Sequence, residues 1–181
     1  GINNTYQQSS AFVSAGLIRA IKSFDFFLIT DLEYGILTTN VIKGAPDRMA
    51  NYTVLGTRFT KGRLVLDGNL LSSLVRDQNQ QDVTVRQKVT GFVGLNYQLL
   101  KGKDIYVKSS YKSSYRLPTF SDLFYNNIGN KELVPETSRQ LNLGVTGVFK
   151  SKWAKQLYYS VNTYYGEIEE KIIAVPTQNL F

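Results

Sequence analysis

The sequence predicts an all-β chain, folded as an antiparallel sheet of about eight strands that forms a segment of a transmembrane β-barrel. Three observations predict this fold class. Apolar and polar residues alternate with a period of two along most of the chain. Most of the alternating segments could form strands of about 8 to 13 residues, longer than the usual five or six. Short connections between these segments alternate with long ones in the sequence.

Strand-like alternation is clearest from residue 24 onward. The segment FDFFLITDLEY (24–34) places Phe24 and Leu28 on one face and Asp25 and Asp31 on the other. A helix is a poor fit, because apolar residues do not recur at i, i+3 and i+4 and glycine interrupts several segments. The predicted strands lie, in chain order, within residues 12–21, 24–34, 52–59, 62–75, 88–98, 104–116, 140–149 and 156–167.

The later segments follow the same rule. Residues 88–98 oppose Val89 and Leu95 to polar neighbours, and residues 140–149 and 156–167 oppose Leu, Val and Tyr to Asn, Ser and Thr. In residues 104–116 the polar face carries a basic row, made of Lys108, Lys112 and Arg116. Such a row could attract anionic ligands or pair with carboxylates of another domain inside a barrel.

The connections favour a membrane barrel over a soluble fold. Short turns are predicted near residues 22–23, 60–62, 101–103 and 151–155, and long connections near 36–50, 76–82 and 116–136. A tilted strand of about 9–11 residues crosses a bilayer, and outer-membrane barrels have short periplasmic turns and longer outer loops. The alternative is a soluble sandwich or lipocalin-like barrel, in which the apolar faces pack inward.

Composition excludes several kinds of site. The chain has 181 residues, 21 Lys and Arg against 14 Asp and Glu, and neither Cys nor His. Disulfides, Cys/His zinc sites and Cys or His nucleophile–base pairs are therefore excluded, and we expect no metal site and no cofactor. The basic residues are dispersed, often at turns, which argues against a nucleic-acid partner. No apolar run is long enough for a transmembrane helix, and residues 1–10 do not form a signal peptide.

Residues 113–145, SSYRLPTFSDLFYNNIGNKELVPETSRQLNLGV, carry two motifs. This stretch resembles the TonB-dependent outer-membrane receptors, in which a strand ending in YR-x-P-x-F-x-DL enters an outer loop and GN-x-x-L-x-PE leads into the next strand. The matching residues are Tyr115, Arg116, Pro118, Phe120, Asp122, Leu123, Gly129, Asn130, Leu133, Pro135 and Glu136. Residues 171–181, KIIAVPTQNLF, resemble the loop entry that follows in Bacteroidetes-type members.

The resemblance implies a barrel of about 22 strands with an N-terminal plug domain in the bacterial outer membrane. Neither a plug nor a coupling segment is recognisable, so we interpret residues 1–181 as a partial β-barrel domain that lacks the plug and the remaining strands. The implied partners are outer-membrane lipid, the plug domain of the parent chain, a periplasmic energy-transducing protein and a nutrient ligand.

Two pairs of residues are expected to set the strand ends and a turn of the long connection. Pro118 and Pro135 lack a backbone donor, so each is expected to end strand pairing. Gly129 and Asn130 form a turn dipeptide suited to positive φ.

Candidate ligand contacts lie in the same connection and at its rim. Arg116, Asp122 and Glu136 could form an ion-pair network that fixes the loop, and the first two could also contact a ligand. Aromatic residues beside amides suit flat or sugar-like ligands, but they suit loop packing and the interfacial girdle as well. The candidates are Arg116, Asp122, Tyr125, Asn126, Asn127 and Asn130.

The sequence thus predicts energy-coupled, ligand-gated uptake of a scarce nutrient, such as a metal chelate or cobalamin, across the outer membrane. The alternative is a soluble or self-contained small β-barrel that binds a ligand in its mouth. An enzyme is not expected. Asp25, Asp31 and Glu33 share a face but have no accompanying nucleophile, and a water-lined lumen explains them.

Overall fold

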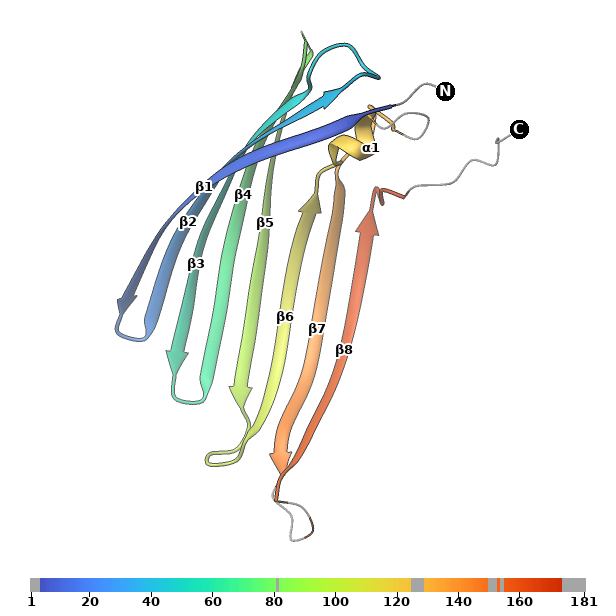
Figure 1. Ribbon diagram of the computed structural model, residues 1–181. Helices are drawn as coiled ribbons and strands as arrows, with labels where there is room; N and C mark the ends of the chain where they lie inside the picture. Colours follow the sequence, from blue (N-terminus) through green and yellow to red (C-terminus); the bar gives the residue numbers. More distant parts are fainter. Residues whose placement is uncertain (1–3, 81, 125–128, 150–152, 154, 174–181) are drawn as a thin grey trace, which may run out of the picture.

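The computed structural model describes residues 4–80, 82–124, 129–149, 153 and 155–173. Its strands form one antiparallel sheet in which neighbours in the chain are neighbours in space (Figure 1). The predicted strand number is confirmed, and the strands are 12 to 17 residues long. The elements are β1 Tyr6–Ile21, β2 Phe24–Thr39, β3 Asp47–Lys61, β4 Leu64–Asn79, β5 Asp82–Gln98, β6 Ile105–Arg116, α1 Phe120–Phe124, β7 Glu136–Phe149 and β8 Leu157–Glu169.

The connections fall at two opposite ends of the sheet. We call the end with α1 the loop end; its connections are 40–46, 80–81 and 117–135. We call the other the turn end; its connections are 22–23, 62–63, 99–104 and 150–156. Lys22 and Gly62 have positive φ, as tight two-residue hairpin turns require.

The predicted alternation of connection lengths is only partly correct. The long connection expected at 76–82 is wrong, because β4 continues to Asn79 and β5 begins at Asp82. The polar run there stays in strand form since Asp77 finds ion-pair partners on both neighbouring strands. The connection expected at 36–50 shrinks to 40–46, which is no longer than 150–156 at the turn end. Only 117–135 is distinctly long.

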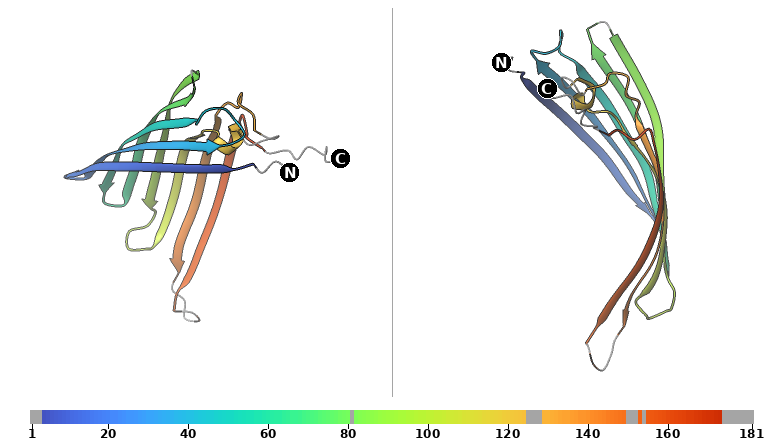
Figure 2. Two further views of the ribbon diagram at one scale, coloured as in Figure 1. Left: turned by 45° about the horizontal axis from the view of Figure 1, so that its top comes forward. Right: turned by 90° about the vertical axis from the view of Figure 1, so that its right-hand side faces the viewer.

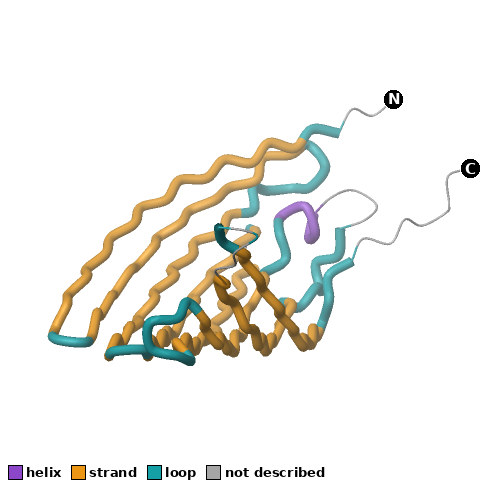
Figure 3. The backbone as a smooth tube through the Cα atoms, turned by 90° about the horizontal axis from the view of Figure 1, so that it is seen from below, coloured by secondary structure: helices purple, strands orange, loops and turns teal. Residues whose placement is uncertain are grey.

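The sheet is curved, and its two faces differ in chemistry (Figures 2 and 3). The α1 helix lies on the concave side, and the cross-strand register assigns every strand residue to one face. The predicted faces are confirmed: Asp25, Asp31 and Glu33 share the concave face with Lys108 and Lys112. Most of the leucines and most of the valines in the strands lie on the convex face.

An apolar belt covers the convex face. In each of six strands the convex positions are uncharged over nine or more consecutive residues: 24–38, 64–74, 83–97, 105–115, 141–149 and 157–165. Each stretch is long enough for one bilayer crossing of roughly 9–11 residues. Convex Leu55 and Leu70 are each 58% exposed, so they do not pack inward as the soluble alternative requires. Among the described residues, the only helix is too short to cross a membrane.

Strands β5 and β6 part toward the loop end. Their pairing runs from Gln98↔Tyr106 to Phe92↔Lys112 and stops there. Ser113 of β6 bridges the two strands at the point where they part. Its Oγ accepts a hydrogen bond from the Gly91 N–H (2.9 Å) and lies 3.4 Å from the Gly91 carbonyl oxygen. Beyond this point, β5 keeps only β4 as a strand neighbour in the described part of the chain.

Candidate functional site

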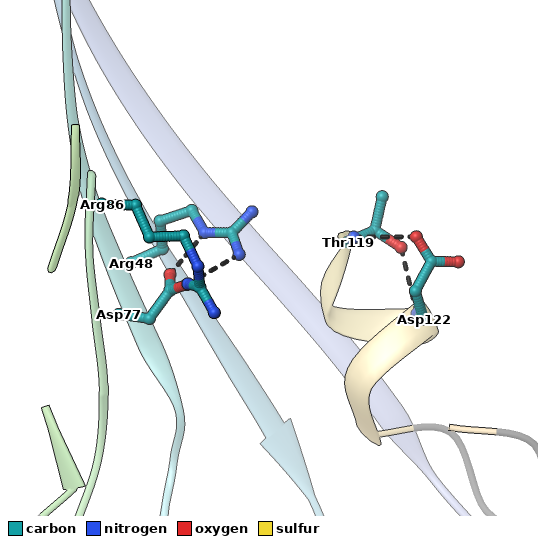
Figure 4. A network of polar contacts seen from close by, with 5 residues as sticks. All are labelled: Arg48, Asp77, Arg86, Thr119 and Asp122. Carbon is teal, nitrogen blue, oxygen red and sulfur yellow. Dashed lines mark hydrogen bonds and ion pairs between the residues drawn. The ribbon is translucent and has the colours of Figure 1, made fainter. Parts of the chain in front are cut away.

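The long connection forms a short helix because its first turn is capped. The Thr119 N–H donates to Asp122 Oδ2 (2.8 Å), and the Asp122 N–H donates to Thr119 Oγ1 (3.1 Å) (Figure 4). This reciprocal arrangement is a capping box, here with Asp in the place of Glu or Gln. Pro118, fully buried, precedes the cap, and β6 ends at Arg116. The prediction that Pro118 and Pro135 delimit strand pairing is confirmed, since β7 begins directly after Pro135.

Two buried side chains anchor α1 to the concave face. Phe120 is 5% exposed and Leu123 is 6% exposed. The Phe120 ring lies over Gly35 of β2, 3.7 Å from where a Cβ would stand, and the Arg48 guanidinium is 5.3 Å from the ring centroid. The connection therefore folds inward onto the sheet and does not project away from it.

Arg48 belongs to a three-strand ion-pair network beneath the helix. Its Nε lies 2.5 Å from Asp77 Oδ1 and its Nη2 lies 3.0 Å from Asp77 Oδ2, while Arg86 Nη1 reaches the same Oδ2 at 2.6 Å (Figure 4). All three side chains are about one-fifth exposed or less. The two Arg48–Asp77 contacts, in fork geometry, link β3 to β4, and the Arg86–Asp77 contact links β4 to β5. The cation–π contact between Arg48 and Phe120 links this network to α1.

A second network ties the two ends of the connection together. Arg116 lies 3.4 Å from Asp122 and 3.8 Å from Glu136, which confirms the predicted rim network. Glu136 also accepts a hydrogen bond from the Ile172 N–H (3.1 Å). Arg116 and Asp122 are thus engaged with each other and with the loop, and a role of either in ligand contact stays a prediction.

Asn130 also supports the loop, but not as predicted. Its N–H donates to the Asp122 carbonyl oxygen (2.9 Å), and its Oδ1 accepts from the Glu132 N–H (2.9 Å). Asn130 does not have positive φ, and an Asx turn forms at this residue. Positive φ at Gly129, which borders residues outside the described ranges, stays a prediction. Asn130 is exposed. Tyr125, Asn126 and Asn127 lie outside the described residues.

A cavity of about 390 Å³ opens between α1 and the ends of β4 and β5. This volume falls within the range of about 300–1,000 Å³ typical of small-molecule sites. Asp47, Asn79 and Asp82 line the strand side, and Phe124 and Lys131 line the loop side. Neither Asp47 nor Asp82 forms an ion pair with another described residue. Lys131 Nζ lies 5.8 Å from the Phe124 ring centroid.

Sequence reasoning missed this cavity and the Arg48–Asp77–Arg86 network. Both depend on residues 76–82, which were interpreted as a loop. Val75, Asp77 and Asn79 are alternate residues that share the concave face, so the period-two pattern continues through them. Because polar residues also stand at the positions between them, the sequence alone did not show this alternation.

The concave face offers charged and polar groups. Ser14 Oγ donates to Asp31 Oδ1 (2.5 Å), which fits a wet lining better than acid–base chemistry. Within the described ranges, no group of three or more Asp or Glu residues is arranged to hold a metal ion.

Comparison with known proteins shows which family the chain belongs to. The family model "TonB dependent receptor-like, beta-barrel" matches residues 51–181. The solved structure of the copper transporter OprC superimposes on 91% of this chain with a TM-score of 0.69 at 14% sequence identity, and the match spans 30% of that chain. No curated protein matches by sequence. The apolar convex belt, the wet concave face and the family match agree, and the chain belongs to the TonB-dependent receptor-like β-barrel family.

Proposed function

We propose that this chain is a wall segment of an outer-membrane receptor that takes up a scarce nutrient by ligand-gated, energy-coupled transport. The family and the solved transporter of the same fold support transport across the outer membrane. The observation that carries the proposal is the inward-folded connection 117–135, which is docked on the polar side of an apolar-backed wall. A loop in this position narrows the mouth of a barrel and meets whatever enters it.

In this proposal the convex belt faces outer-membrane lipid, and the concave face surrounds the plug domain of a longer parent chain. A periplasmic energy-transducing protein acts through parts outside residues 1–181. The basic row of Lys108 and Lys112 lies on the concave face, where it would pair with plug carboxylates or attract an anionic cargo. Residues 171–181 support assignment to the Bacteroidetes-type members.

The cargo is proposed to be a metal chelate, cobalamin or a similar large solute. The chain has no Cys or His, and its one methionine, Met49, lies on the convex face. Copper and other soft metals favour sulfur and imidazole ligands, so this segment would hold the organic part of a chelate and not its metal. The proposed contacts are Arg116, Asp122, Tyr125, Asn126, Asn127 and Asn130, with the cavity-lining Asp82 and Lys131.

Growth of the parent strain tests the proposal directly. A strain lacking the gene is expected to grow poorly when one iron chelate, copper source or cobalamin is limiting, and the intact gene restores growth. A gene carrying Phe120→Asp, which undocks the loop, is expected to restore less. Normal growth of the deletion strain on every such source would contradict the proposal.

A further inference from the structure

The turn end carries a collar of basic side chains. Its members are Arg19, Lys22, Lys61, Arg63, Lys101, Lys103 and Lys155. They come from the four connections of that end or from the strand residues beside them. The acidic residues described at the same positions are Asp25 and Asp104. No collar residue forms an ion pair with another described residue.

Several collar residues lie on the lipid side of the wall. Arg19 and Lys61 occupy convex positions in the register, beside Phe26 and Leu64 respectively. The Arg63 guanidinium lies 5.3 Å from the ring centroid of convex Tyr97, and its Nη1 donates to the Leu99 carbonyl oxygen (3.0 Å). These three charges are therefore not directed toward the lumen, where a plug would pack.

A cluster of aromatic rings lies on the strands next to the collar at β2 and β3. Phe24, Phe26 and Phe59 are clustered at the turn end of β2 and β3, with the Phe24 and Phe59 ring centroids 4.7 Å apart. Rings at such a level mark the boundary between hydrocarbon and headgroups in membrane barrels. Basic residues just beyond this boundary lie at the depth of lipid phosphates, and long Lys and Arg stems can extend to it.

The loop end differs. Most of its arginines are paired: Arg48 and Arg86 with Asp77, Arg116 with Asp122 and Glu136, and Arg139 with Glu169. The basic residues of that end without an ion pair to another described residue are Lys43, Arg76, Lys131 and Lys171. If Lys and Arg at the turn end served only solubility, they would need no lipid-side placement and no stacking on an interfacial ring. Their lack of ion-pair partners within the described ranges leaves these charges available to an external anion.

We propose that the collar binds the phosphate headgroups of anionic phospholipids in the periplasmic leaflet. The orientation rests on the proposed function, in which the loop end faces outward. Each Lys or Arg near an anionic bilayer surface contributes a separate attraction that weakens with salt. Several such residues on one rim give a preference for anionic over zwitterionic lipid and set the level of the wall in the membrane.

The test uses the complete receptor in nanodiscs of phosphatidylcholine with and without fluorescent phosphatidylglycerol. The collar variant is Lys22→Gln, Lys61→Gln and Lys103→Gln. The matched control removes the same charge at exposed loop-end positions: Lys43→Gln, Arg76→Gln and Lys171→Gln. An unchanged thermal unfolding midpoint shows that each variant is folded.

We expect the collar variant to lose roughly tenfold or more in phosphatidylglycerol affinity, the control to change less than about twofold, and wild-type binding to weaken as salt rises. Equal losses in both variants, or retained affinity in the collar variant, would overturn the proposal. A collar variant that instead loses affinity for the phosphates of lipopolysaccharide would also overturn it, because the collar would then face the outer leaflet. Growth on limiting nutrient is measured separately, so a failed lipid test leaves the uptake proposal standing.

Discussion

Strands β3 and β4 carry two Arg–Asp pairs of the same chemistry in different surroundings. Arg48 and Asp77 face each other at the loop end, and Arg58 and Asp67 face each other nearer the turn end. The first pair is 14% and 17% exposed, whereas the second is 58% and 30% exposed. The first also holds Arg86 and stacks on Phe120; the second has Nε–Oδ1 contact of 2.6 Å and no further ion-pair partner among the described residues.

The difference shows that burial and shared contacts decide what an ion pair contributes. An exposed pair is screened by water and contributes about 0–1 kcal/mol. A buried pair whose partner is removed leaves an uncompensated charge, which costs about 3–5 kcal/mol. The Arg48–Asp77 pair at the loop end is thus expected to contribute to the stability of the wall, whereas the exposed Arg58–Asp67 pair nearer the turn end contributes little.

The largest expected effect comes from the helix anchor. Phe120→Ala removes a buried ring from the Gly35–Arg48 surface and should weaken docking of the connection by about 3 kcal/mol. Limited proteolysis of the complete receptor is expected to cleave within 117–135 about a hundredfold faster. Val134→Ala, at a side chain 50% exposed, is the control and should leave the cleavage rate unchanged. Slow cleavage of the Phe120 variant would mean that α1 is held by other contacts.

Removing the shared carboxylate is expected to have an effect of similar size, and it tests the two pairs directly. Asp77→Ala leaves Arg48 and Arg86 without their anion and should cost about 3 kcal/mol. Asp67→Ala, on the same strand, should cost less than about 1 kcal/mol. The two costs are compared by chemical denaturation of the receptor in detergent. Equal costs would show that burial does not distinguish the pairs.

The smallest effect is expected at the helix cap. Thr119→Ala removes the hydroxyl that accepts the Asp122 N–H and should weaken the α1 turn by about 1 kcal/mol. Thr119→Ser keeps a hydroxyl and should restore most of the loss. The same protease assay measures both variants. A Ser variant as sensitive as the Ala variant would assign the effect to the lost methyl group and not to the cap.

Much of the sheet could be predicted because the alternation of apolar and polar residues along a strand indicates which face meets lipid and which meets water. The faces of 24–34 and 104–116 and the strand breaks at Pro118 and Pro135 were all readable, since each depends on local sequence. The extension of β4 through Asp77 was not readable. A run of polar residues indicates a loop unless its cross-strand partners are known, and Arg48 lies 29 positions away in the chain.

The candidate site could be predicted only in part for the same reason. The Arg116–Asp122–Glu136 network lies within one motif, and its ion pairs form as expected. The cavity brings together Asp47 at the start of β3, Asp82 at the start of β5 and Lys131 in the connection 117–135, and only the tertiary fold specifies that they converge. The inward direction of α1 likewise depends on contacts with residues distant in the chain, such as the Arg48 guanidinium over the Phe120 ring.

The parting of β5 from β6 has a consequence for amide hydrogen exchange. Residues 83–90 are bonded to β4 on one side, but on the other their main-chain groups face no strand within the described part of the chain. In an antiparallel strand, successive N–H groups point to opposite sides. Deuterium should therefore enter at every second amide from Val83 to Thr90 within seconds, while the amides between them stay protected, and the change to uniform protection beyond Gly91 would locate the Ser113 bridge in solution.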